Sequence, residues 1–106
     1  QTRSFCHIDD TIDGLFLLMR GEYKQIINIG NPKNTSINDL AKLIILKINP
    51  ELKLNYLPKL EDEPFYRKPS IKLAEKVLGW TPNINLNEGL DLTIDFYRKF
   101  LNKKMY

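Results

Sequence analysis

Apolar residues recur at helical spacing in four stretches of the sequence, and three shorter stretches have the composition of strands. The residues from Ile37 to Ile48 include a wide apolar stripe at helical spacing. Helices are expected at about 9–20, 36–48, 71–78 and 85–101, and strands at 1–8, 25–29 and 53–57. The order predicts an α/β fold with four helices and about three short strands.

The predicted helices have boundary residues of the kinds that start and stop helices. Asp9 or Asp10 can N-cap the first helix, and N-capping is a simpler role for Asp10 than that of a catalytic carboxylate. Four further boundary residues are the N-caps Ser36 and Asn85 and the glycine stops Gly21 and Gly79.

The run Ile26-Ile27-Asn28-Ile29 is apolar without clean alternation, which is typical of a strand buried on both faces of a parallel sheet. Such a strand needs neighbours on both sides, and few other strands are predicted. The chain also begins at Gln1 and not at methionine. We therefore expect that it is part of a larger fold whose other strands lie in further sequence.

Composition narrows the classes of function. The 106 residues are 42% hydrophobic and 27% charged, an ordinary globular balance, and the net charge is +3. Acidic residues alternate with the basic ones, which argues against nucleic-acid binding. No apolar run approaches the roughly 18 residues of a membrane span. The single cysteine, Cys6, excludes an internal disulfide and fits a reduced, cytoplasmic setting, where it is expected as a small core residue on a strand.

Signatures of cofactor-dependent catalysis are absent from these 106 residues. The five glycines do not form the closely spaced turn that receives a dinucleotide pyrophosphate. No tyrosine is followed four residues later by a lysine, so the usual pair for hydride transfer is missing. His7 has no nucleophile that the sequence places beside it, and we expect it as a partly buried strand residue.

Several segments resemble a known family. The opening Gln1–Asp10 resembles the Arg-x-Phe-x-x-Val-x-Asp signature of extended short-chain dehydrogenases/reductases that act on nucleotide sugars, with Ile8 in place of valine. Asn28–Pro32, Arg67–Ile71 and the tail after Leu78 resemble elements of UDP-glucuronate decarboxylases, which include UDP-xylose synthases and the decarboxylase domain of lipid A-modifying enzymes. The resemblance spans nearly the whole chain.

The resemblance implies roles for three residues. Arg3 matches an arginine that contacts the UDP diphosphate, which suits the bidentate hydrogen bonds of a guanidinium. Gln1 matches a residue that lines the nucleotide site. Arg67 matches an arginine near the sugar carboxylate, where charge stabilisation is a safer role than proton donation. From the residues alone, Arg3 could equally be a surface strand residue, and Arg67 could pair with Glu61, Asp62 or Glu63.

For the whole protein, the resemblance implies an extended Rossmann-type fold in which residues 1–106 are the C-terminal, sugar-nucleotide-binding portion, with the N-terminal NAD-binding portion absent. The parent would be a cytoplasmic, homodimeric, NAD-dependent decarboxylase of UDP-glucuronate. The chain alone would bind no NAD and would be inactive. A nucleotide-sugar 4-epimerase, a 4,6-dehydratase and a non-catalytic binding or assembly module remain the alternatives.

Overall fold

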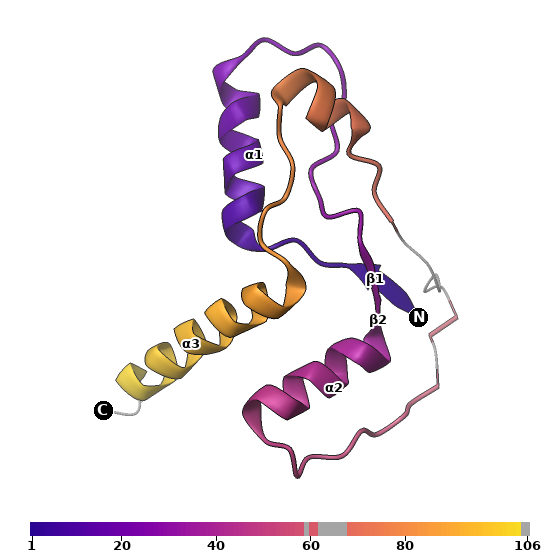
Figure 1. The fold of residues 1–106 in the computed structure, drawn as a ribbon, viewed down its shortest axis with the longest axis vertical. Coiled ribbons are helices and arrows are strands. Elements are labelled where there is room, and N and C mark those ends of the chain that lie inside the picture. Colours follow the sequence, from indigo (N-terminus) through magenta and orange to yellow (C-terminus); the bar gives the residue numbers. More distant parts are fainter. Residues whose placement is uncertain (59, 62–67, 105–106) are drawn as a thin grey trace.

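The computed structural model describes residues 1–58, 60–61 and 68–104. Within them, four helical elements and two short strands follow one another along the chain (Figure 1). Their bounds are β1 Thr2–Ser4, α1 Ile8–Arg20, β2 Asn34–Ser36, α2 Ile37–Ile48, the π-helical turn η1 Ala74–Leu78, and α3 Leu86–Lys104. The four predicted helices are therefore confirmed.

The two strands form a small antiparallel sheet that joins distant parts of the chain. Arg3 of β1 lies opposite Thr35 of β2. The Ser4 hydroxyl donates a hydrogen bond of 2.8 Å to the side-chain oxygen of Asn34. Helix α2 follows β2 without a loop, and its first N–H group, at Ile37, donates to the Gln1 carbonyl at 2.9 Å. The sheet thus fixes the start of α2 beside the beginning of the chain.

Side-chain caps start three of the helices. The Ser36 hydroxyl accepts from the Asp39 N–H at 3.0 Å, and the Asn85 carbonyl oxygen accepts from the Glu88 N–H at 2.8 Å, which confirms both predicted caps. The predicted aspartate cap of α1 is wrong. The cap is His7, whose Nδ1 accepts from the Asp9 N–H at 3.1 Å. Because the helix begins at Ile8, Asp9 falls inside its first turn, where a negative charge suits the helix dipole.

Glycine ends two helices in different ways. Gly79 follows η1 with φ 65°, in the left-handed region that favours glycine, and its N–H donates to the Ala74 and Glu75 carbonyls. Gly21 follows α1 with an extended backbone. Both predicted stops are confirmed, although only Gly79 requires the conformational freedom of glycine.

The strand predictions are correct only in part. β1 covers three of the eight residues predicted at 1–8, so Cys6 and His7 lie outside it. The segments 25–29 and 53–57 form no strand, because neither is hydrogen-bonded to a neighbouring strand within the described residues. Ile26 is 93% exposed, whereas Ile27 and Ile29 pack against the core. The sequence pattern does not predict β2, because its residues Asn34–Ser36 are polar.

The core lies between α1 and η1, in the upper part of Figure 1. It consists of Ile71, Ala74 and Trp80, with partly buried apolar side chains around them. The Trp80 indole N–H donates to the Asp10 carbonyl at 2.9 Å, so Trp80 anchors the core to α1. Gly14 of α1 faces this tryptophan, and a methyl group there would lie 3.2 Å from the Trp80 ring. Absence of a side chain at position 14 lets α1 approach the core closely.

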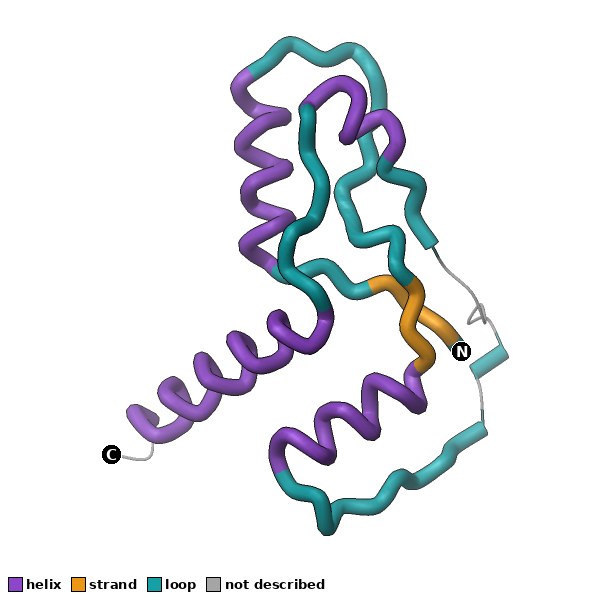
Figure 2. Tube along the Cα trace, viewed as in Figure 1, coloured by secondary structure: helices purple, strands orange, loops and turns teal. Residues whose placement is uncertain are grey.

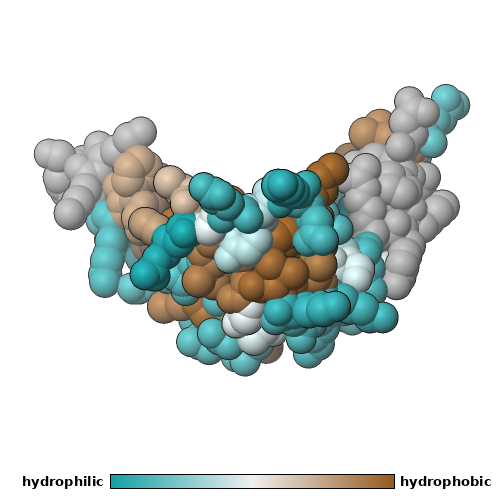
Figure 3. All heavy atoms as spheres, turned by 90° about the horizontal axis from the view of Figure 1, so that it is seen from above, coloured by the Kyte–Doolittle hydropathy of each residue, from teal (hydrophilic) through white to brown (hydrophobic). Residues whose placement is uncertain are grey.

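The described chain is more extended than an ordinary domain of its length. Its radius of gyration is 16.8 Å, against about 13 Å for a compact domain of roughly 100 residues. Long loops separate α1, β2 and η1 (Figure 2), and α2 and α3 extend away from the core. Many large apolar side chains are exposed, among them Phe16 and Met19 of α1 and Phe96 of α3. Figure 3 shows a broad apolar area on one face.

None of the helices in the described part of the chain is both long and apolar enough to cross a membrane.

Candidate substrate-binding site

Arg3, the predicted phosphate ligand, is the middle residue of β1 and is half-buried. One of its guanidinium nitrogens donates to the Thr2 carbonyl at 2.7 Å, which restrains the side chain near its own strand. Among the described residues, no carboxylate forms an ion pair with Arg3. The guanidinium has further N–H groups that this one hydrogen bond does not use.

Arg3 lines an open hollow of about 570 Å³. Its other lining residues are Ser4, Asn28, Lys68 and Pro69, so three segments that are distant in the sequence meet there. Pro69 packs on Gly30, where an added methyl would lie 3.0 Å from a proline ring carbon. This contact holds the chain before η1 against the segment that leads into β2.

Among the described residues that line the hollow, the ionisable ones are Arg3 and Lys68, and both are cationic. Ser4 and Asn28 add polar groups. Two cations that share a hollow repel one another in the absence of a ligand, and both are attracted to an anion between them. A guanidinium and an ammonium together suit the oxygens of a phosphate. The arrangement can therefore bind an anionic group and contains no group placed for covalent chemistry.

The structure does not bring Gln1 to this hollow. Gln1 is exposed and lines a different hollow of about 340 Å³, together with residues of the start of α2 and the segment 54–57. Arg67, the predicted cation for the sugar carboxylate, lies outside the described residues. It immediately precedes Lys68, which lines the Arg3 hollow. The motif Arg67–Ile71 therefore includes a residue that lines the hollow. The resemblance gave a role to Arg67, however, and none to Lys68.

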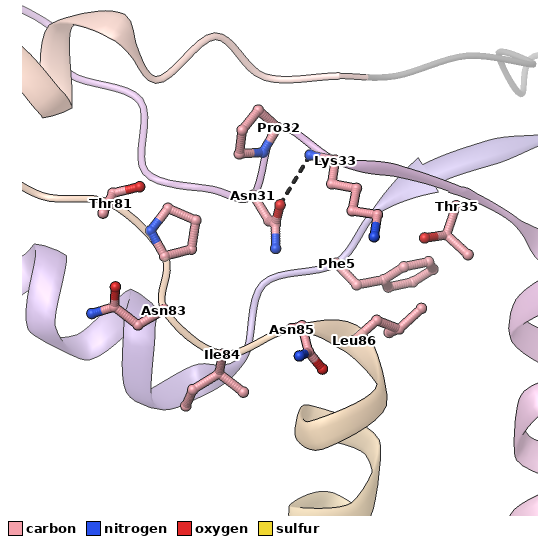
Figure 4. A pocket seen from close by; sticks show the side chains of 11 residues that line it. Phe5, Asn31, Pro32, Lys33, Thr35, Thr81, Asn83, Ile84, Asn85 and Leu86 are labelled. Carbon is pink, nitrogen blue, oxygen red and sulfur yellow. Dashed lines mark hydrogen bonds between the residues drawn. The ribbon is translucent and has the colours of Figure 1, made fainter.

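A further hollow of about 260 Å³ lies between β2 and the segment before α3 (Figure 4). Asn31 and Lys33 border it on one side, with the Asn31 side-chain oxygen accepting from the Lys33 N–H at 2.9 Å. Asn85 borders it on the other side, where its side chain also caps α3. The Phe5 ring contributes an apolar wall. None of the predicted site residues lines this hollow.

Asp10, considered above as a cap, does not cap α1 in the structure. It is buried, and its carboxylate accepts from the Ile84 N–H at 2.9 Å. It therefore connects α1 to the segment that leads into α3. No local sequence pattern predicts this contact, because its two partners are 74 residues apart.

The residues that could support metal or nucleotide-cofactor chemistry are dispersed. No group of three or more His, Cys, Asp or Glu side chains that could hold a metal occurs in the described ranges. Gly14 faces the core, Gly30 faces Pro69, and Gly89 faces His7, so each serves packing at a separate place. A dinucleotide site needs closely spaced glycines between a strand and a helix. The described residues do not fit NAD, and no step of hydride transfer is assigned to them.

The chain is similar to proteins of known activity. It is 43% identical over 102 residues to UDP-glucuronic acid decarboxylase 3 of Arabidopsis thaliana, a match that covers 96% of this chain and 30% of that protein. It is 39% identical over 101 residues to UDP-glucuronic acid decarboxylase 1 of Xenopus tropicalis, which covers 95% of this chain and 24% of that protein. The chain thus spans less than a third of the length of these relatives. No protein-family model matches it.

Solved structures with the same fold include UDP-sugar 4-epimerases, one of them in complex with NAD. The structure of UDP-glucose 4-epimerase from Thermotoga maritima with UDP-glucose matches with a TM-score of 0.88 and 29% identity, over 94% of this chain and 32% of that one. UDP-glucuronic acid 4-epimerase from Bacillus cereus, in complex with UDP-glucuronic acid and NAD, matches with a TM-score of 0.83 and 29% identity, over 94% and 33%. The predicted fold class is confirmed: the chain forms about a third of a Rossmann-type epimerase/dehydratase fold.

Proposed function

From the premise that this chain is part of an extended short-chain dehydrogenase/reductase related to the UDP-glucuronic acid decarboxylases, we propose that residues 1–106 are its C-terminal, sugar-nucleotide-binding portion. The substrate of the whole protein would be UDP-glucuronate. NAD would bind to the N-terminal portion, and the protein would be a cytoplasmic homodimer. The chain alone would contribute binding and no turnover.

The observation that carries this proposal is the position of Arg3. It is half-buried at the edge of a hollow with a second cation and has no carboxylate partner in the described part of the chain. A merely structural arginine on a strand is usually exposed or paired. In the proposed role, its free N–H groups would donate to the oxygens of the UDP diphosphate. Gln1, two residues before Arg3 in the sequence, would line the nucleotide part of the same substrate.

Arg67 is proposed to lie beside the carboxylate of the sugar. A guanidinium keeps its proton at neutral pH, so it would stabilise negative charge and would not act as an acid. Loss of CO2 from a 4-keto sugar acid leaves an enolate, and a fixed cation lowers the energy of that charge. NAD would supply the oxidation at C4 that makes this loss possible, through residues outside this chain.

A second candidate reaction is 4-epimerisation of a UDP-sugar. It is favoured by the Bacillus cereus enzyme, which is named as a 4-epimerase and was solved with UDP-glucuronic acid and NAD. The two candidates share the bound substrate and differ in its fate. Release of CO2 from UDP-glucuronate by the whole protein would select the decarboxylase, and formation of a UDP-hexuronate epimer without CO2 would select the epimerase.

Titration of the chain with UDP, followed by NMR or calorimetry, tests the proposed binding role. Saturable binding is expected, and Arg3→Gln should weaken it about 10-fold or more, since a hydrogen bond to a charged group contributes about 1.5–3 kcal/mol. Uridine, which lacks the diphosphate, should be insensitive to this change. Absence of UDP binding, or tight DNA binding with a steep salt dependence, would contradict the proposal. NADH formation from NAD and UDP-glucuronate by the chain alone would contradict its expected inactivity.

A further inference from the structure

Lys68 is the second cation of the Arg3 hollow, and no sequence motif considered above gave it a role. It stands between Arg67 and Pro69 in the sequence, and its side chain is exposed. In the described ranges it forms no ion pair with a carboxylate. The position of its backbone is nevertheless determined by its neighbour, because Pro69 packs on Gly30.

The connection between Lys68 and Arg3 runs through packed residues. Gly30, which contacts Pro69, belongs to the segment that continues into β2. β2 in turn pairs with β1, with Thr35 opposite Arg3. Lys68 and Arg3 are therefore held on the same part of the molecule, although they are 65 positions apart in the sequence, and both line the hollow of about 570 Å³.

We infer that Lys68 is a second ligand for the diphosphate of the nucleotide sugar, acting with Arg3 across this hollow. This inference rests on the proposed function. A diphosphate carries charge on two adjacent phosphoryl groups, so two cations from different segments can each approach one of them. The Arg3 fork supplies directed hydrogen bonds, and the Lys68 ammonium supplies a mobile point charge. Binding would also link the segment before η1 to the sheet, since the ligand contacts both.

Lys72 provides a matched control. It is a lysine four residues further along the same segment, and it is exposed, as Lys68 is. It lines an adjoining hollow with Pro69 and Glu75, whereas it does not line the hollow of Arg3. Lys68→Gln and Lys72→Gln therefore each remove one positive charge from the same segment. Only Lys68→Gln removes a group from the proposed site.

The test is titration of the whole chain with UDP and, separately, with inorganic pyrophosphate, at two salt concentrations. Lys68→Gln is expected to weaken both ligands about 5-fold or more and to reduce the salt dependence, whereas Lys72→Gln should change either affinity less than about 2-fold. Circular dichroism of each variant should match that of the unchanged chain, because neither lysine is buried.

The outcomes separate this inference from the function on which it rests. If the unchanged chain binds UDP, Arg3→Gln weakens the binding and Lys68→Gln behaves as Lys72→Gln does, the role of Lys68 is wrong and the proposed function stands. Equal weakening by the two lysine changes would reveal a general charge effect and would also overturn the inference. If the unchanged chain binds neither UDP nor pyrophosphate, the proposed function itself fails.

Discussion

Asp10 offers the sharpest test of how the described fold is held together. It is 3% exposed, and it makes two contacts with the segment that leads into α3. Its carboxylate accepts from the Ile84 N–H, and its backbone carbonyl accepts from the Trp80 indole, each at 2.9 Å. Only the first contact depends on the aspartate side chain. Asp10→Ala therefore removes one hydrogen bond to a charged acceptor and leaves the other in place.

The expected loss of stability follows from this single bond. A hydrogen bond to a charged group contributes about 1.5–3 kcal/mol, and the Ile84 N–H would be left partly buried without its acceptor. Loss of a negative charge from the first turn of α1 adds roughly 0.3–1 kcal/mol. We expect Asp10→Ala to lower the free energy of unfolding by about 2–4 kcal/mol. For a chain of this length, that corresponds to a fall in Tm on the order of 10 °C.

Thermal and urea unfolding followed by circular dichroism at 222 nm would measure the change. Asp9→Ala is the matched control, because Asp9 lies in the same helical turn and its side chain is 68% exposed. It removes the same charge without the buried bond and should cost less than about 1 kcal/mol. Asp10→Asn keeps an oxygen that can accept from Ile84, so its loss should be at most about half that of Asp10→Ala.

Two results would refute the reasoning. If Asp10→Ala and Asp9→Ala lower the stability equally, the carboxylate contributes only through the helix dipole and not through Ile84. If Asp10→Asn is as unstable as Asp10→Ala, the amide oxygen of asparagine does not replace the carboxylate as acceptor for the Ile84 N–H. The stabilisation would then depend on the negative charge of Asp10.

Two further predictions concern packing and surface charge. Gly14→Ala should destabilise the chain by about 1 kcal/mol in urea unfolding, because the new methyl would lie 3.0 Å from Ile29 and 3.2 Å from Trp80. In Gly89→Ala the new methyl would lie 3.3 Å from His7. We expect this second change to be neutral or stabilising, because alanine favours the helix. Greater destabilisation by Gly89→Ala would contradict this order. The 2.6 Å pair Lys47–Asp91 joins α2 to α3, and a double-mutant cycle with Lys47→Gln and Asp91→Asn should give a coupling below about 1 kcal/mol that falls at high salt. A larger coupling that salt does not change would show that this pair is shielded from solvent.

The helices could be predicted from the sequence because their determinants are local. Ser36 and Asn85 cap their helices through N–H groups three residues away, and an apolar stripe marks each helical face. Gly79 likewise ends η1 through a conformation that its own lack of a side chain permits. Each of these features depends on a few neighbouring residues and not on where distant segments of the chain lie.

The strands could not be predicted equally well because a strand needs a partner. Ile26–Ile29 has the composition of a strand and yet forms none in the described residues, where no neighbour hydrogen-bonds to it. Asn34–Ser36 has no apolar pattern and forms β2, because Thr2–Ser4 lies beside it. Composition alone does not report which segments meet.

The candidate site divides in the same way. Arg3 was identified from a motif, and it lines a hollow whose described residues suit the proposed binding of phosphate. Lys68 was not identified, because its place beside Arg3 depends on the contact of Pro69 with Gly30 and on the pairing of the two strands. Arg67 lies outside the described residues, and its proposed role rests on resemblance alone.

The position of Trp80 gives this chain a built-in optical reporter. It is the single tryptophan among the 106 residues, and its ring is buried between α1 and η1 with its N–H bound to the Asp10 carbonyl. The indole emission therefore comes from one place in the fold, with no background from other tryptophans. Separation of α1 from η1 would expose the ring to water and shift that emission to longer wavelength, so opening of the core can be followed in the unlabelled protein.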